Sequence, residues 1–164
     1  MKRDIAALSD LARRTYAAAF GHSLTASDLA HHLEAHLSDA RFGEALEEDV
    51  VLVAEDDGRL IGFLQFGPLR MPVDAPSPGD EEIRRLYVLS ETQNRGVGTR
   101  LMDAALAHPR LRDAASVYLD VWERNDGAIR LYERYGFRIV GSREFAKASG
   151  AAADRDFVMV RRKG

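Results

Sequence analysis

The sequence predicts an α/β (α+β) fold in which helices cover both faces of a mixed β-sheet. Apolar residues recur at helical spacing in 4–20, 96–107 and 125–135, and short runs typical of strands lie between these segments. The length of 164 residues is that of one domain with a sizeable core. We therefore expect residues 1–164 to form a single domain.

The N-terminal half is expected to contain two helices and a β-hairpin. The helix at 4–20 is followed by a capping-box pattern that starts a second helix over 25–37. Strands are expected at 50–55 and 60–66, because the Asp-Asp-Gly sequence between them is typical of a tight turn. Four of the five prolines fall within 67–80, so we expect this segment to be a loop.

The C-terminal half alternates strands with helices. Residues 116–122 are nearly continuously apolar except at Asp120, which is typical of a central strand covered on both faces. Pro109 is expected to end the preceding helix, and Gly136 the following one. The expected elements are strands at 82–88, 116–122, 137–140 and 157–160, and helices at 96–107 and 125–135.

The composition argues against several classes of protein. The 23 basic and 26 acidic residues give a net charge of −3, which offers no broad basic surface for nucleic acid. The absence of cysteine excludes disulfides, cysteine-ligated metals and a cysteine nucleophile, and it fits a cytoplasmic protein. No apolar run approaches the roughly 20 residues of a membrane span, and no apolar signal core follows the N-terminus. His32 and His36 have a metal-compatible spacing but no third-ligand pattern, so we expect a solvated helix face and no metal.

The most informative segment is the strand 82–88 followed by a turn that opens a helix on Gly96 and Gly98. Such a turn presents free backbone N–H groups at the positive end of the helix dipole, where a phosphate or pyrophosphate binds. Glycine permits close approach of the backbone to the anion. A tight helix entry without a ligand is the structural alternative.

A second sequence pattern, further along the chain, makes the interpretation of this turn more specific. The order is the strand Glu82–Val88, a Gln-x-x-Gly-x-Gly element at 93–98, and a strand that runs into Asn125. The pattern closes with Ala-Ile-Arg-Leu-Tyr-Glu-Arg-Tyr-Gly-Phe at 128–137. The combination resembles the GNAT superfamily of N-acetyltransferases. The resemblance implies a mixed, mostly antiparallel sheet of six to seven strands flanked by helices on both faces, with acetyl-CoA as co-substrate and no metal.

The resemblance also implies roles for individual residues. Tyr132, seven residues after Asn125, would protonate the leaving thiolate as general acid. Asn125 would bind the pantetheine amides, and an N-cap role is compatible with this. The strand before the loop would pair its backbone with pantetheine, and the loop would bind pyrophosphate. The residues so assigned to cofactor binding are Leu86, Tyr87, Val88, Gln93, Asn94, Arg95, Gly96, Val97, Gly98, Thr99, Arg100, Asn125 and Tyr132.

The general base has several candidates. Glu82 stands eleven residues before Gln93, where some members of the family carry a catalytic Glu, and apolar strand neighbours would raise its pKa towards neutrality. Asp120 stands where peptide N-terminal acetyltransferases of the family usually have Glu. Glu81 and a water chain are further options.

The function that follows is transfer of an acetyl group to a primary amine by direct attack in a ternary complex. The acceptor would be a small molecule or a peptide N-terminus. The alternative is a non-catalytic acyl-CoA-binding sensor or interaction domain. Because members of the family often dimerise, the resemblance admits a homodimer as well as a monomer.

Overall fold

The computed structural model describes residues 2–20, 47–93, 95–145 and 154–164, together with isolated positions between 26 and 44. Most of the helix expected at 25–37, including His32 and His36, lies outside the described residues, as does Asn94. Within the described part, no helix is both long enough and apolar enough to span a bilayer.

The sheet has six strands in the order β1-β2-β3-β4-β6-β5, which confirms the predicted fold class. Strands β3 and β4 are parallel, and all other neighbours are antiparallel. The elements are α1 (Lys2–Phe20), β1 (Val50–Asp56), β2 (Arg59–Pro68), β3 (Glu81–Val88), the 3₁₀ turn η2 (Ser90–Thr92), α4 (Val97–Ala107), α5 (Pro109–Asp113), β4 (Ser116–Trp122), α6 (Asp126–Arg134), β5 (Arg138–Phe145) and β6 (Asp154–Arg162).

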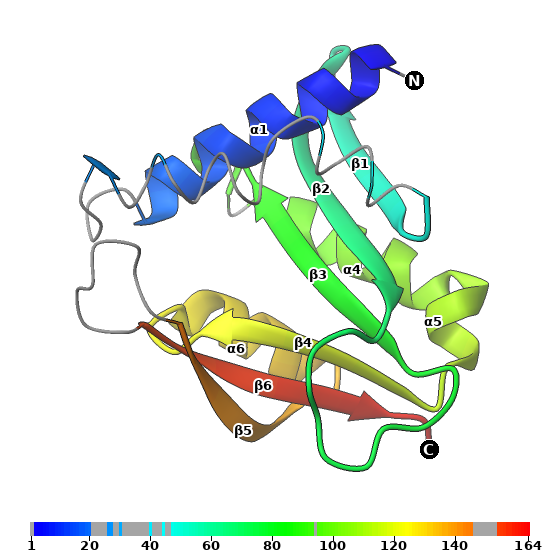
Figure 1. The fold of residues 1–164 in the computed structure, drawn as a ribbon. Coiled ribbons are helices and arrows are strands. Elements are labelled where there is room, and N and C mark those ends of the chain that lie inside the picture. Colours follow the sequence, from blue (N-terminus) through cyan, green and yellow to red (C-terminus); the bar gives the residue numbers. More distant parts are fainter. Residues whose placement is uncertain are drawn as a thin grey trace.

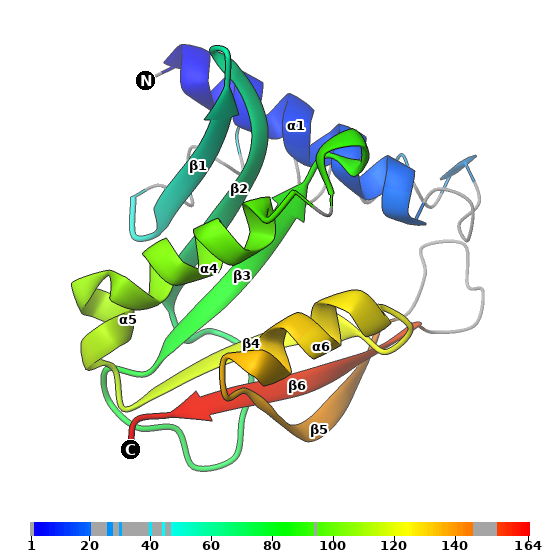
Figure 2. The same cartoon turned by 180° about the vertical axis from the view of Figure 1, so that it is seen from behind.

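Helices cover the two faces of the sheet unequally. Figure 1 shows α1 crossing one face in front of β2 and β3. Figure 2, from behind, shows α4 and α5 over β2 and β3, and α6 over β4 and β6. The main core lies between these layers, and Phe63, Leu64 and Phe66 of β2 are wholly buried within it. Because β2 alternates its side chains between the two faces, it contributes to both layers.

Two local differences from the sequence prediction concern the C-terminal half. Pro109 does not merely end α4: it occupies the first position of a short helix, α5, where its missing N–H costs nothing. The last two strands are longer than expected, and β6 lies between β4 and β5. The last strand therefore extends the sheet from β4 and carries β5 on its outer edge.

A β-bulge in β3 shapes the face of the sheet that carries α1. Gln65 of β2 is opposite Arg85, but the next residue, Phe66, is opposite Ile83, so Arg84 is the extra residue. The guanidinium of Arg84 reaches Asp49, which precedes β1. A Cβ at Gly67 would collide with the Asp49 carboxylate, so glycine is required for this approach.

Candidate active site

The sheet is split along the line between β3 and β4. Within these two fully described strands, only Glu81 with Val117 and Glu82 with Tyr118 are paired. Both strands continue beyond these pairs, and Figure 1 shows them diverging. On its other side β3 is paired with β2 as far as Val88. The edge of β3 that faces β4 is therefore available, over its last residues, to pair with an extended ligand.

Leu86, Tyr87 and Val88, predicted to bind pantetheine through their backbone, lie in this splayed part of β3. Their side chains are half-buried against the core. The side chain of Tyr87 packs edge-on against Phe63, with 5.3 Å between ring centroids. Because these side chains pack against the core, the backbone groups of β3 on the side facing β4 are what a ligand would contact.

The predicted phosphate-binding turn leads from η2 into α4. Gly96 is the N-cap of α4 and has φ 76°, a left-handed conformation that favours glycine. No side chain caps the helix there. The first N–H groups of an α-helix have no partner within the helix, and they lie at the positive end of its dipole. A Cβ at Gly96 would meet nothing within 4 Å, so its backbone conformation requires glycine and the space outside it is open.

The other residues of the turn differ in whether their side chains are exposed to the open space outside Gly96. Val97 is buried in the core, so only its backbone is available, whereas Gln93, Thr99 and Arg100 are exposed. Arg95 pairs with Asp56, the last residue of β1, at 3.5 Å. The exposed cation of Arg100, on the first turn of α4, is free to approach a phosphate.

Tyr132, the predicted general acid, lies on α6 and is 7% exposed. Its ring packs edge-on against Phe137, with 6.0 Å between centroids. Burial raises the pKa of Tyr132, and the negative charge of Asp120 and the neighbouring Tyr87 raise it further. The phenol therefore keeps its proton at neutral pH, as a general acid must.

Electrostatic interactions link three polar side chains from the two halves of the split sheet: Tyr87 of β3, Asp120 of β4 and Tyr132 of α6. Burial also raises the pKa of Tyr87; the positive charge of Arg85 opposes the shift, and Asp120 and Asp156 add to it. Neither phenol has a hydrogen-bond partner among the residues that the structure describes. Both hydroxyl groups are therefore available to a ligand.

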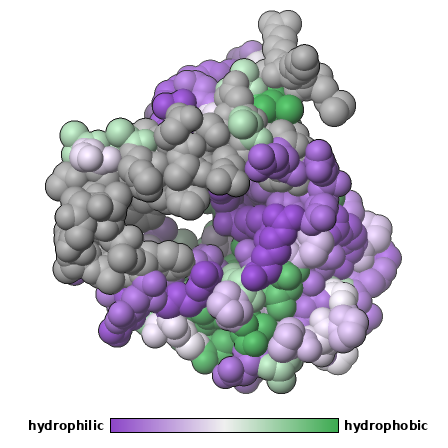
Figure 3. Space-filling view, in the orientation of Figure 1, coloured by the Kyte–Doolittle hydropathy of each residue, from purple (hydrophilic) through white to green (hydrophobic). Residues whose placement is uncertain are grey.

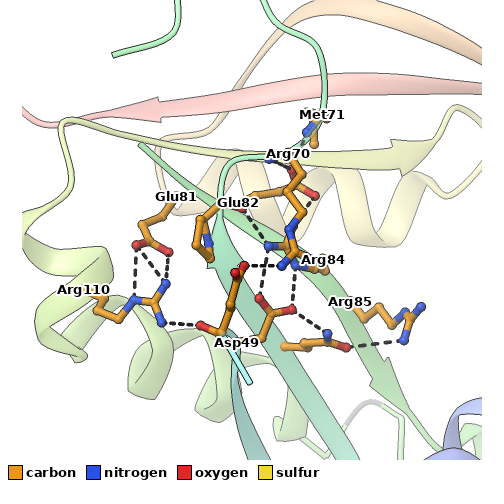
Figure 4. Close-up of polar contacts among 11 residues, drawn as sticks. Asp49, Arg70, Met71, Glu81, Glu82, Arg84, Arg85 and Arg110 are labelled. Carbon is orange, nitrogen blue, oxygen red and sulfur yellow. Dashed lines mark hydrogen bonds and ion pairs between the residues drawn. The ribbon is translucent and has the colours of Figure 1, made fainter. Parts of the chain in front are cut away.

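Glu82 lies where β3 and β4 part, and its carboxylate is engaged on both oxygens (Figure 4). Oε1 accepts hydrogen bonds from the backbone N–H groups of Arg70, at 3.0 Å, and Met71, at 2.9 Å. Oε2 pairs with Arg84 at 3.1 Å. The prediction that apolar neighbours surround the Glu82 carboxylate is therefore wrong. The bulge brings Arg84 beside it, and the 69–80 loop supplies two donors.

The loop that Glu82 holds lies on the same face of the sheet as α1. Figure 3 shows a hydrophobic patch low on this face, where Figure 1 places the 69–80 loop. Met71 of this loop is buried with Tyr118, Val158 and Val160 in a small cluster of its own. The hydrogen bonds from Arg70 and Met71 to Glu82 thus hold the start of the loop beside this small cluster.

Asp120 is placed differently from Glu82. Its side chain is 21% exposed, and its charged partner is Arg143 of β5 at 3.6 Å. Arg143 is itself 30% exposed, so water weakens this pair. Asp120 is also the carboxylate that interacts with both Tyr87 and Tyr132. Glu81, the third carboxylate considered, forms a bidentate pair with Arg110 of α5.

Asn125 and Tyr135 flank α6. The Oδ1 of Asn125 accepts a hydrogen bond from the N–H of Ala128 at 3.2 Å, so the N-cap role is confirmed. Its exposed amide group is still available to a ligand. The hydroxyl of Tyr135 contacts Asp103 of α4.

The comparisons with known proteins decide the family. The chain matches the Acetyltransferase (GNAT) family over residues 6–137. The chain belongs to this family. It is an acyltransferase, and acetyl-CoA is its co-substrate. An uncharacterized N-acetyltransferase of Mycobacterium tuberculosis is similar to this GNAT chain, with 34% identity over 158 residues covering 94% of each protein.

Other relatives share shorter regions or the fold alone. The spermine/spermidine N(1)-acetyltransferase of Bacillus subtilis is 30% identical over 90 residues, which cover 54% of this GNAT chain and 59% of that protein. The PaiA N-acetyltransferase of Thermoplasma acidophilum, solved in complex with coenzyme A, has a TM-score of 0.77 at 18% identity, covering 99% of this chain and 94% of that one. Its likeness shows the fold.

The residues of this GNAT chain fit acetyl-CoA. The left-handed Gly96 and the open first turn of α4 suit the pyrophosphate, and the edge of β3 suits the extended pantetheine arm. Among the described residues, no group of three or more His, Asp or Glu side chains is arranged to hold a metal ion.

Sequence reasoning missed two features of this site. It assigned only the backbone of Tyr87, although the side chain interacts electrostatically with Tyr132 and Asp120. It also missed the Asp49–Arg84–Glu82 cluster, because these residues come from separate segments and meet through a bulge. The alternation of Phe63, Gln65 and Gly67 along β2 could have indicated which face they share.

Proposed function

We propose that this chain transfers an acetyl group from acetyl-CoA to a primary amine, of a small molecule or a peptide N-terminus, by direct attack in a ternary complex. The observation that carries the proposal is the open edge of β3 where the sheet divides, together with the electrostatic interaction between Tyr132 and Asp120. The first turn of α4 approaches α6, which carries Tyr132, since a Cβ added at Gly98 would lie 3.6 Å from Leu131 Cδ2.

Acetyl-CoA would bind along this line from its pyrophosphate to its thioester. The N–H groups around Gly96 and Gly98 would hold the pyrophosphate, and Arg100 would add charge. The backbone of 86–88 would pair with pantetheine, and the amide of Asn125 would bind one of its amide groups. The full set proposed for co-substrate binding is Leu86, Tyr87, Val88, Gln93, Asn94, Arg95, Gly96, Val97, Gly98, Thr99, Arg100, Asn125 and Tyr132.

In the chemical step the amine nitrogen attacks the thioester carbonyl carbon. As the tetrahedral intermediate collapses, the C–S bond breaks and the thiolate takes the proton of the Tyr132 hydroxyl. The amine loses its proton to Asp120, directly or through one water. The proton then passes from Asp120 to solvent, and the next turnover begins once Tyr132 is reprotonated.

Asp120 is preferred to Glu82 as the base because of what surrounds each carboxylate. Both oxygens of Glu82 are occupied by two N–H groups and an arginine. Asp120 has a partly exposed ion pair with Arg143 and interacts electrostatically with the proposed acid, Tyr132. A base must have a carboxylate oxygen free to accept the proton of the amine, and Asp120 is the less engaged of the two carboxylates.

The test is release of the CoA thiol by the purified protein in the presence of a panel of amines, with the acetylated product identified by mass spectrometry. The panel includes polyamines, because one relative is named for spermine and spermidine, as well as amino acids and peptides with free N-termini. Thiol release that depends on one class of amine supports the proposal. Tight binding of acetyl-CoA without turnover on any amine would instead support the non-catalytic sensor.

The proposed role of Asp120 as general base is tested by a substitution at that residue. Asp120→Asn should lower kcat/KM by about 10²–10⁴-fold, the usual contribution of a general base, and remove the acidic limb of the pH–rate profile. Asp113→Asn is the matched control, because Asp113 is exposed on α5 and pairs with its neighbour Arg112. A pH profile of Asp120→Asn identical to that of the wild type would assign the base to another residue or to water.

A further inference from the structure

Tyr135 bridges two helices that lie on opposite sides of the split in the sheet. It is the C-cap residue of α6, and its hydroxyl lies 2.6 Å from Asp103 Oδ1 and 3.1 Å from the carbonyl oxygen of Thr99, both on α4. A phenol has one proton, and the shorter contact with the carboxylate takes it. Burial and the hydrogen bond with Asp103 raise the pKa of Tyr135 to about 12, so the donor stays protonated.

The bridge matters because pairing between the fully described strands β3 and β4 joins the two halves of the sheet at one end only. Beyond Glu82 and Tyr118, β3 and β4 share no pairing. Figure 2 shows α4 on the half that contains β3 and α6 on the half that contains β4. In the part of the chain that the structure describes, all side-chain hydrogen bonds between α4 and α6 come from Tyr135.

Tyr135 is also anchored on its own half of the sheet. Its backbone carbonyl accepts a hydrogen bond from Arg161 Nε of β6 at 2.9 Å. The two helices also approach each other at Gly98, where an added Cβ would lie 3.6 Å from Leu131 Cδ2. Tyr135 adds a directional contact one turn further along α6.

We propose that Tyr135 is a positioning residue that holds the first turn of α4 at a fixed distance from the Tyr132 hydroxyl. Thr99, whose carbonyl it contacts, belongs to the turn assigned to pyrophosphate, and Tyr132 precedes Tyr135 by three residues on the same helical face. With the bridge in place, pyrophosphate bound to α4 delivers the thioester to Tyr132. This inference rests on the proposed function, since it assigns Tyr132 and the α4 turn the roles given above.

A substrate comparison separates positioning from a general structural role. S-acetyl-pantetheine lacks the pyrophosphate and depends only on the β3 edge and Tyr132. Tyr135→Phe should lower kcat/KM for acetyl-CoA by about fivefold to tenfold, as expected for loss of a charge-assisted hydrogen bond, and leave kcat/KM for S-acetyl-pantetheine unchanged. An equal loss on both substrates would show that the residue supports the fold only and would overturn the proposal.

Variants of Asp103 test the partner in the same assay. Asp103→Asn keeps an oxygen acceptor and should retain most of the activity with acetyl-CoA, whereas Asp103→Ala should behave like Tyr135→Phe. The double variant Tyr135→Phe/Asp103→Ala should be no worse than either single variant. Additive losses would show that the two side chains act independently and would contradict the bridge.

A distance measurement decides the proposal without turnover. The chain has no cysteine, so spin labels can be placed at Ala107→Cys on α4 and Arg130→Cys on α6, both exposed positions. The distance distribution should broaden when Tyr135→Phe is added. It should not change with Glu144→Gln, which removes an exposed pair with Arg155 within the β5–β6 half. An unchanged distribution in Tyr135→Phe would overturn the bridge, whether or not any amine is acetylated.

Discussion

Replacing Glu82 with glutamine should destabilise the fold without removing the acidic limb of the pH–rate profile. The substitution keeps the shape of the side chain and an oxygen that accepts the N–H groups of Arg70 and Met71. It replaces the second oxygen with an amide NH₂ group that faces Arg84 (Figure 4). Two donors then oppose each other where an ion pair stood.

The magnitude follows from the burial of this pair. The side chains of Glu82 and Arg84 are 11% and 12% exposed, so water screens their interaction little. A hydrogen bond to a charged group contributes about 1.5–3 kcal/mol. Burial lowers the pKa of Arg84, but its hydrogen bond with Asp49 and the charge of Glu82 raise it by more. Asp49 still binds Arg84 in the variant, so the loss in free energy of unfolding should stay within that range. A loss of about 2 kcal/mol would lower Tm by about 4–8 °C.

The assay is denaturant unfolding of both proteins, followed by the pH dependence of kcat/KM. Glu91→Gln is the matched control, because Glu91 pairs with Arg59 at 2.8 Å on the exposed surface and its loss should change stability little. Unchanged stability of Glu82→Gln, together with loss of the acidic limb, would refute the reasoning and assign Glu82 the role of base.

Three further predictions concern the co-substrate site and the buried phenols. Gly98→Glu should abolish acetyl-CoA binding in calorimetry yet fold normally, because a Cβ there makes only an ordinary contact with Leu131; unchanged affinity would remove the turn from the site. Tyr132→Phe should lower kcat by about 10²–10⁴-fold with little change in acetyl-CoA affinity, and a wild-type rate would exclude Tyr132 as the acid. Burial raises the pKa of Tyr87 and of Tyr132 above the unfolded value of about 10, so stability should be lost as pH rises from about 10 through the folded pKa values. Unfolding measured at increasing pH checks this, and a flat dependence that Tyr132→Phe leaves unaltered would contradict it.

Helices and strands of this chain were predictable because their signals are local. The apolar periodicity of α4 and α6 and the near-continuous apolar run of β4 fall within single segments, and the structure places these elements within a residue or two of the expected ranges. The position of β6 between β4 and β5 was not predictable, because strand order depends on contacts between distant segments. The short helix α5 was missed because Pro109 was interpreted only as the end of the preceding helix.

In the candidate site, too, the features set by local sequence were predictable and those set by contacts between distant segments were not. The turn at Gly96 and the position of Tyr132 follow from short-range spacing, which a sequence displays. The surroundings of Glu82 depend on a bulge in β3 and on donors from the 69–80 loop, and nothing in the local sequence indicates that they meet. The contact of Tyr135 with Asp103 likewise depends on how α6 packs against α4.

The central claim is that the thioester of acetyl-CoA lies beside Tyr132 where β3 and β4 diverge. A crystal structure of the protein with coenzyme A tests it most directly. The account predicts the pyrophosphate on the N–H groups of the first turn of α4, the pantetheine arm along the edge of β3, and the sulfur within hydrogen-bond reach of the Tyr132 hydroxyl. Coenzyme A bound with its sulfur away from Tyr132, or with its pyrophosphate away from Gly96–Arg100, would contradict it.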